Sequence, residues 1–182
     1  METPESTLYF TYGTLQTGYP NHASHAEDLG PSLGRYRTVE AWPLVVPLAP
    51  SCPNPGCRFD HRIGALLERA GQGECVEGEL FEVSGETLER FDELENYRPQ
   101  DEAHSTYLRR SVRVEPVSGG EGREAQVYFI VDAAPYEQLL QRHGAEVVGR
   151  YTLEMAQGRL KACCRRDPDH EGPHEARSPF GP

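Results

Sequence analysis

Residues 74–97, ECVEGELFEVSGETLERFDELENY, pass from the pattern of a β-strand to that of an α-helix in one continuous run. Apolar and polar residues alternate, imperfectly, over residues 74–83, which is typical of a strand. Beyond them the apolar residues Leu88, Phe91 and Leu94 recur three apart, which is the spacing of one face of a helix. This run predicts a domain in which a sheet carries helices on its surface.

One carboxylate, that of Glu95, falls on the apolar face of the predicted helix. It follows Phe91 by four positions and Leu88 by seven, so it shares their side at about 100° per residue. Burial raises the pKa of a carboxyl, and a position near a helix C-terminus raises it further. A carboxylate tuned toward neutral pH suits a general base. Glu95 is therefore the first candidate for a catalytic residue, the alternative being a last-turn glutamate that points into water.

The composition limits the classes of function. The chain has 182 residues, with 18 Lys and Arg against 29 Asp and Glu, and a net charge of −11. An acidic surface argues against nucleic acid as a partner, because phosphate binding needs basic residues. No run approaches the roughly 20 apolar residues that cross a bilayer. The N-terminus, METPESTLYF, has no signal-peptide pattern, so we expect a soluble, cytoplasmic protein.

The remaining pattern predicts an α+β domain built on a small mixed or antiparallel β-barrel of about five to six strands with flanking helices. Further strands are expected at residues 8–12, 37–47 (broken at Pro43), 107–117 and 125–131, and further helices at residues 63–70, 135–143 and 151–160. Residues 16–35 look polar and irregular. We expect one domain over residues 1–161, with an inserted loop at 49–73, followed by an irregular tail over 162–182.

The inserted loop and the tail contain residues able to bind zinc. The set comprises Cys52, Cys57, Cys163, Cys164, His170 and His174. The spacing from Cys164 to His174 suits a tetrahedral site, whereas that between Cys52 and Cys57 is looser than usual. Free thiols, or a disulfide under oxidation, remain alternatives to structural zinc, so we assign no metal.

The first strand ends in Tyr12-Gly13-Thr14-Leu15. Glycine permits a sharp turn or the close approach of a ligand. Successive backbone N–H groups in such a turn can form a small anion-binding concavity. Taken alone, the motif is equally consistent with an ordinary turn from a strand into a loop.

Several motifs together resemble the γ-glutamyl cyclotransferase family over residues 8–132, and most nearly its γ-glutamylamine branch. They are YGTL after the first strand, Pro20-Asn21-His22 soon after it, VEGELFEV, a helix ending in LE, and YLRR. The resemblance implies a small β-barrel with flanking helices, no cofactor, and a single catalytic glutamate at the position of Glu95. The inserted loop and the tail depart from the family pattern.

The resemblance also implies the chemistry. In a γ-glutamyl amide the substrate's own α-amine attacks its γ-carbonyl carbon, which releases 5-oxoproline and a free amine without a protein nucleophile. Glu95 would then move the proton, while the amides of Gly13–Leu15 would hold either the substrate carboxylate or the developing oxyanion. Tyr12, Tyr107 and Tyr128 are candidates for the pocket and equally for the core.

We therefore expect an enzyme acting on a small γ-glutamyl amine, with no nucleic acid or membrane as partner. Two alternatives remain. One is a non-catalytic binding module on the same fold. The other is a cyclotransferase for another γ-glutamyl conjugate, such as a dipeptide, glutathione or a biosynthetic intermediate.

Overall fold

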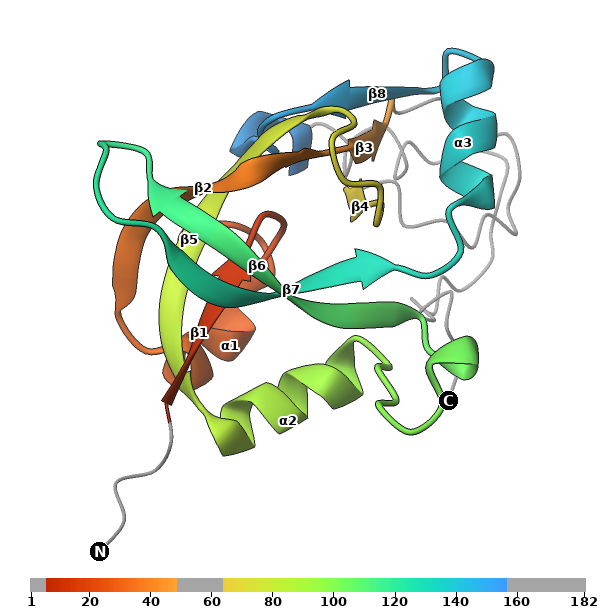
Figure 1. Ribbon diagram of the computed structural model, residues 1–182. Coiled ribbons are helices and arrows are strands. Elements are labelled where there is room, and N and C mark those ends of the chain that lie inside the picture. Colours follow the sequence, from red (N-terminus) through yellow and green to blue (C-terminus); the bar gives the residue numbers. More distant parts are fainter. Residues whose placement is uncertain (1–5, 49–63, 157–182) are drawn as a thin grey trace, which may run out of the picture.

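Five strands close into a barrel in the part of the chain that the computed structural model describes, residues 6–48 and 64–156. Around the barrel they are β1 (Ser6–Thr11), β5 (Glu74–Ser84), β2 (Ser32–Trp42), β6 (Tyr107–Pro116) and β7 (Arg123–Ile130). Neighbouring strands are antiparallel except at the closure, where β1 and β7 run parallel with Tyr9 opposite Gln126. The predicted small mixed barrel with flanking helices is confirmed (Figure 1).

A second sheet lies beside the barrel. It consists of β4 (Ala65–Leu66), β3 (Leu44–Pro47) and β8 (Ala145–Val148), with β3 in the centre. Pro43 separates β2 from β3, as predicted, because proline has no N–H to continue a ladder. The helix α3 (Ala134–Gln141) leads from the barrel into β8 and matches the helix predicted there.

Three expectations for local structure differ from what is observed. Residues 64–70 contain β4 and a turn in place of a helix, because Ala65 and Leu66 pair with the adjacent strand β3. Residues 16–35, which were expected to be polar and irregular, contain α1 (His22–Leu29) and the start of β2. The helix expected at 151–160 is a short helical turn over 153–156 within the described residues.

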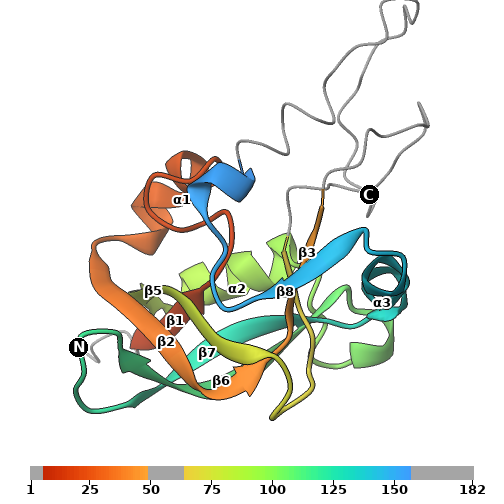
Figure 2. The same cartoon turned by 90° about the horizontal axis from the view of Figure 1, so that it is seen from above.

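The helix α2 (Gly85–Leu94) packs on the outside of the barrel (Figures 1 and 2). The Ser84 hydroxyl accepts the Thr87 N–H at 3.1 Å and so caps the helix N-terminus, as the sequence predicts. Phe91 is buried, with its ring centroid 5.1 Å from that of Tyr9 on β1. Leu94, by contrast, is the last residue of the helix and is 52% exposed.

The strand β1 contributes residues to two apolar clusters. The cluster inside the barrel includes Phe10, Val76, Leu80, Val112, Val127 and Phe129. The cluster between the barrel and the helices includes Tyr9, Leu15, Phe81, Leu88, Phe91, Tyr107, Tyr128 and Tyr136. Alternation along a strand places Tyr9 and Phe10 on opposite faces, so the outer cluster becomes the support on which α2 lies.

Gly78 on β5 lets the backbone approach closely at this point. A Cβ there would lie 2.6 Å from the ring of Phe10 and in collision with the carbonyl oxygen of Thr11. The close approach brings β5 against the end of β1, immediately before the YGTL turn.

No helix within residues 6–48 and 64–156 has both the length and the apolar character needed to cross a bilayer. The six Cys and His residues considered for zinc lie outside the described residues, as does the tail. Within the described part of the chain no group of three or more potential metal ligands is found.

Candidate active site

Glu95 occupies the C-cap position of α2, where its N–H donates to the carbonyl oxygen of Phe91 at 2.9 Å. The side chain is half-buried, and the loss of water around its carboxylate raises the pKa to about 7. No cationic side chain among the described residues forms an ion pair with it. Burial without a counter-charge therefore gives Glu95 a carboxylate that can bind and release a proton near neutral pH.

Two buried tyrosines lie within the electrostatic reach of this carboxylate. Burial raises the pKa of Tyr9 and of Tyr12, and the negative charge of Glu95 raises both further. Both phenols therefore stay neutral, and Tyr12 donates its hydroxyl to the carbonyl oxygen of Tyr128 at 2.9 Å. Since Tyr12 directly precedes Gly13, the charge of Glu95 also acts at the beginning of the YGTL turn.

The YGTL turn lies on the surface of the outer cluster. Leu15 is 6% exposed and packs into that cluster, whereas Gly13 and Thr14 are partly exposed. A Cβ added at Gly13 would meet no atom within 4 Å, so the space beside the turn is open. A ligand can approach the backbone there.

The N–H groups of Gly13, Thr14 and Leu15 donate to no acceptor within the described residues. The carbonyl oxygens of the same turn are occupied, because that of Gly13 accepts from Gln16 and that of Thr14 accepts the Asn21 N–H at 3.1 Å. Unpaired successive N–H groups form the kind of concavity that binds anions. Anion binding at this turn and proton transfer by Glu95 stay predictions, and the open N–H groups and the raised pKa are the features that support them.

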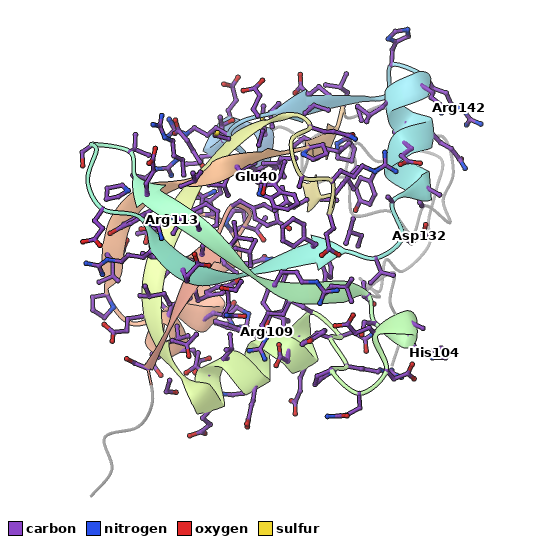
Figure 3. The ribbon with its side chains drawn as sticks, in the orientation of Figure 1. Glu40, His104, Arg109, Arg113, Asp132 and Arg142 are labelled. Carbon is purple, nitrogen blue, oxygen red and sulfur yellow. The ribbon has the colours of Figure 1, made fainter. Side chains whose placement is uncertain are left out.

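Tyr107 and Tyr128 are buried in the outer cluster, at 7% and 3% exposure. The Tyr128 hydroxyl donates to Oδ1 of Asp92 at 2.7 Å, one helical turn before Glu95. Arg109 on β6 places its Nε 3.4 Å from the same oxygen. Figure 3 shows Arg109 between the barrel and α2.

The electrostatics of Asp92 follow from this position. Burial raises the pKa of the Asp92 carboxyl, and the hydrogen bond from Tyr128 and the charge of Arg109 partly offset the rise. Arg109 also lies over the ring of Tyr97, with its guanidinium carbon 5.5 Å from the ring centroid. These contacts attach the C-terminal half of α2 to β6 and β7.

Comparison with known proteins now decides the family. Residues 9–146 match the family described as "Gamma-glutamyl cyclotransferase, AIG2-like". The chain belongs to this family. The match extends from the strand before the YGTL turn into β8, and it makes the protein an enzyme of the γ-glutamyl cyclotransferase kind, as its motifs predict.

Relatives of this cyclotransferase occur in animals and plants. The mouse protein named gamma-glutamylaminecyclotransferase is 32% identical over 133 residues, which cover 70% of this chain and 78% of the mouse protein. An Arabidopsis thaliana protein, provisionally named a gamma-glutamylcyclotransferase, is 33% identical over 172 residues, covering 86% and 82% of the two chains. The crystal structure of a mouse AIG2-like protein superposes with a TM-score of 0.60 at 27% identity, covering 81% of this chain and 89% of the other.

Two buried polar residues beside the YGTL turn were not singled out from the sequence. Gln16 directly follows the YGTL turn and is almost fully buried. Glu79 on β5 accepts both the N–H of Thr17, at 2.6 Å, and its hydroxyl, at 2.9 Å. The only signal for Glu79 was its place in the VEGEL motif, and a lone glutamine in a polar loop gave none.

Proposed function

We propose that this cyclotransferase acts on γ-glutamyl amines and converts them to 5-oxoproline and a free amine. The bond between the substrate's α-nitrogen and its γ-carbonyl carbon forms, and the bond from that carbon to the amine nitrogen breaks. The α-ammonium loses two protons as it becomes the ring N–H of 5-oxoproline, and the departing nitrogen gains two as it leaves as a protonated amine. The mouse and rat relatives, named for γ-glutamylamines, support this choice of substrate.

Glu95 carries the proposal. Its carboxylate, with a pKa of about 7 and no paired cation among the described residues, can take a proton from the α-ammonium and return one to the leaving amine. A non-catalytic binding protein has no need of such a carboxylate, since burying a charge without compensation is unfavourable.

The amides of Gly13, Thr14 and Leu15 are proposed to hold the α-carboxylate of the γ-glutamyl group. Backbone N–H groups offer partial positive charge without a cationic side chain, so they can bind an anion while leaving Glu95 unpaired. A substrate held at its carboxylate can bend so that its amine faces its own γ-carbonyl, and such positioning supplies a large part of the rate enhancement. Tyr12 and Tyr107 are proposed to shape the wall of this pocket.

Tyr128 is proposed to line the pocket with its ring and to hold Tyr12 in place through its main-chain carbonyl. Its hydroxyl is engaged by Asp92, so it contributes to the site through α2 and Tyr12. None of these residues is assigned to bind the amine portion of the substrate.

The test is to incubate the full chain separately with γ-glutamyl-lysine, γ-glutamyl-alanine and glutathione, and to measure 5-oxoproline. We expect the fastest release from γ-glutamyl-lysine. Glu95→Gln should lower kcat by about 10² to 10⁴, the usual contribution of an acid–base group. Glu93→Gln, two residues earlier and exposed on the same helix, is the matched control and should retain activity.

Two results would contradict the proposal. Release of no 5-oxoproline from any of the three substrates would favour a binding module. Full activity of Glu95→Gln would remove this residue from the mechanism.

A further inference from the structure

Gln16 is a buried polar side chain whose hydrogen bonds all reach the YGTL turn or the barrel. It is 1% exposed. Its Nε2 donates to the carbonyl oxygen of Tyr12 at 3.0 Å and to that of Gly13 at 3.1 Å. Its Oε1 accepts from Nη1 of Arg35 at 2.8 Å. Burying an amide is unfavourable unless its groups are paired, and here three bonds pair them.

Arg35 determines which way round the amide of Gln16 lies. A guanidinium has only donors, so the amide oxygen must face it and the NH₂ group must face the two carbonyl oxygens. Arg35 is itself held on β2 by an ion pair with Glu77 of β5, 3.4 Å between Nη2 and Oε2. The orientation of Gln16 is therefore set by two barrel strands.

The hydrogen bonds that hold the Tyr12 and Gly13 carbonyls also set the direction of the N–H groups that follow them. Each peptide unit is planar and trans, so its C=O and the N–H of the next residue point in opposite directions. The Tyr12 carbonyl points toward Gln16, so the Gly13 N–H points away from Gln16. The Gly13 carbonyl also points toward Gln16, so the Thr14 N–H points away from Gln16 as well. The third unit is held separately, because Asn21 binds the Thr14 carbonyl and so directs the Leu15 N–H.

The residue after Gln16 fixes the end of the turn. Thr17 donates both its N–H and its hydroxyl to the buried carboxylate of Glu79. The chain from Tyr12 to Thr17 is thus attached to the barrel at both ends. Between these ends, the side-chain amide of Gln16 sets the orientation of the peptide groups.

We propose that Gln16 is a positioning residue that aims the Gly13 and Thr14 amides at the α-carboxylate of the substrate. The inference rests on the proposed function, which places that carboxylate at these amides. Gln16 touches the turn and not the substrate, so it acts through the backbone.

The experiment measures substrate affinity with and without turnover in the full chain. Gln16→Met keeps the length of the side chain and removes all three hydrogen bonds. For γ-glutamyl-lysine we expect KM to rise about 10- to 100-fold while kcat stays within about threefold, because loss of ground-state binding raises KM alone. Calorimetric titration of γ-glutamyl-lysine into Glu95→Gln and into the Glu95→Gln/Gln16→Met double variant should give the same ratio of Kd values.

A matched control separates positioning from stability. Thr38→Val on β2 also removes buried hydrogen bonds, those from its hydroxyl to the Glu40 carbonyl at 2.6 Å and from the Val76 N–H at 2.8 Å. It should lower the Tm with little change in KM. Arg35→Met should raise KM in the same sense as Gln16→Met, and the double variant Gln16→Met/Arg35→Met should be no worse than Gln16→Met alone, because Arg35 acts through Gln16.

An unchanged Kd and KM in Gln16→Met would overturn the inference, whatever the change in Tm. A fall in kcat at constant KM would also overturn it, since the amides would then serve the oxyanion. If the wild type releases no 5-oxoproline but Glu95→Gln binds γ-glutamyl-lysine more tightly than the double variant with Gln16→Met, the proposed function fails and the positioning role stands.

Discussion

The hydroxyl of Tyr128 donates to Oδ1 of Asp92 across 2.7 Å and joins β7 of the barrel to the helix that ends at Glu95. The main-chain carbonyl of the same Tyr128 accepts the Tyr12 hydroxyl at 2.9 Å. One residue therefore contacts both the helix that ends at Glu95 and the tyrosine that precedes Gly13.

Tyr128→Phe removes the bond to Asp92 and leaves the bond from Tyr12, which goes to the backbone. We expect a loss of about 1 kcal/mol in unfolding free energy, as for one buried hydrogen bond. We also expect kcat/KM to fall about tenfold because α2 is held less firmly. Asp92→Asn, which keeps an acceptor for the tyrosine, should have the smaller effect on kcat/KM. Steady-state kinetics and urea unfolding measure both, and equal kinetics for wild type and Tyr128→Phe would refute the coupling.

The pH dependence of turnover should report Glu95. The free enzyme needs the carboxylate form to accept a proton, and burial raises the pKa to about 7. We expect kcat/KM to be low in acid and to rise through about pH 7. An acidic limb near the ordinary value of 4.5 for a glutamate would show that the carboxylate is solvated during the reaction.

The same group should make stability depend on pH. The folded pKa of Glu95 is raised above its unfolded value, so its favourable contribution is complete below about pH 4.5 and is lost as the pH rises through about 7. At pH 8, Glu95→Gln should unfold with a free energy on the order of 2 kcal/mol higher than wild type, after allowance for its partial exposure. At pH 4.5 the two should differ little. Urea unfolding at both pH values measures the difference, and equal stability at pH 8 would contradict burial of the charge.

Gly78→Ala tests the close approach of β5 to β1. The added Cβ would collide with the Thr11 carbonyl and lie 2.6 Å from the Phe10 ring, so we expect a loss of several kcal/mol or failure to fold. Gly85→Ala is the control, because its Cβ meets nothing within 4 Å and alanine favours a helix. Thermal unfolding of the two variants should therefore move in opposite directions.

Local periodicity predicted much of the barrel and the helix that ends at Glu95, because the apolar residues of β5 and α2 are mostly buried. It missed α1, whose residues HASHAEDL bury one side chain, Leu29, and so give no apolar stripe. It assigned a helix near Ala65 and Leu66, where pairing with β3 overrides the local preference. The prediction of Leu94 on the buried face is wrong, because this last residue of α2 is 52% exposed.

Gln16 could not be predicted, because its environment is made by residues distant in the sequence. A polar residue in a loop is usually solvated. Its burial requires Arg35, brought alongside by β2, and the turn that precedes it. Tyr128 was predicted as a pocket residue, but its partner Asp92 lies on another element, so no local pattern could indicate that bond.

The parallel closure of the barrel has a consequence for how the protein is made. Tyr9 and Gln126 belong to opposite ends of the barrel's chain path, so the ring of strands stays open on the ribosome until β7 has emerged. During that interval the edge of β1 lacks its parallel neighbour, and Asp92 on α2 lacks the hydrogen bond that it accepts from Tyr128 in the folded protein. The helix that ends at Glu95 is therefore joined to β7 only late in synthesis.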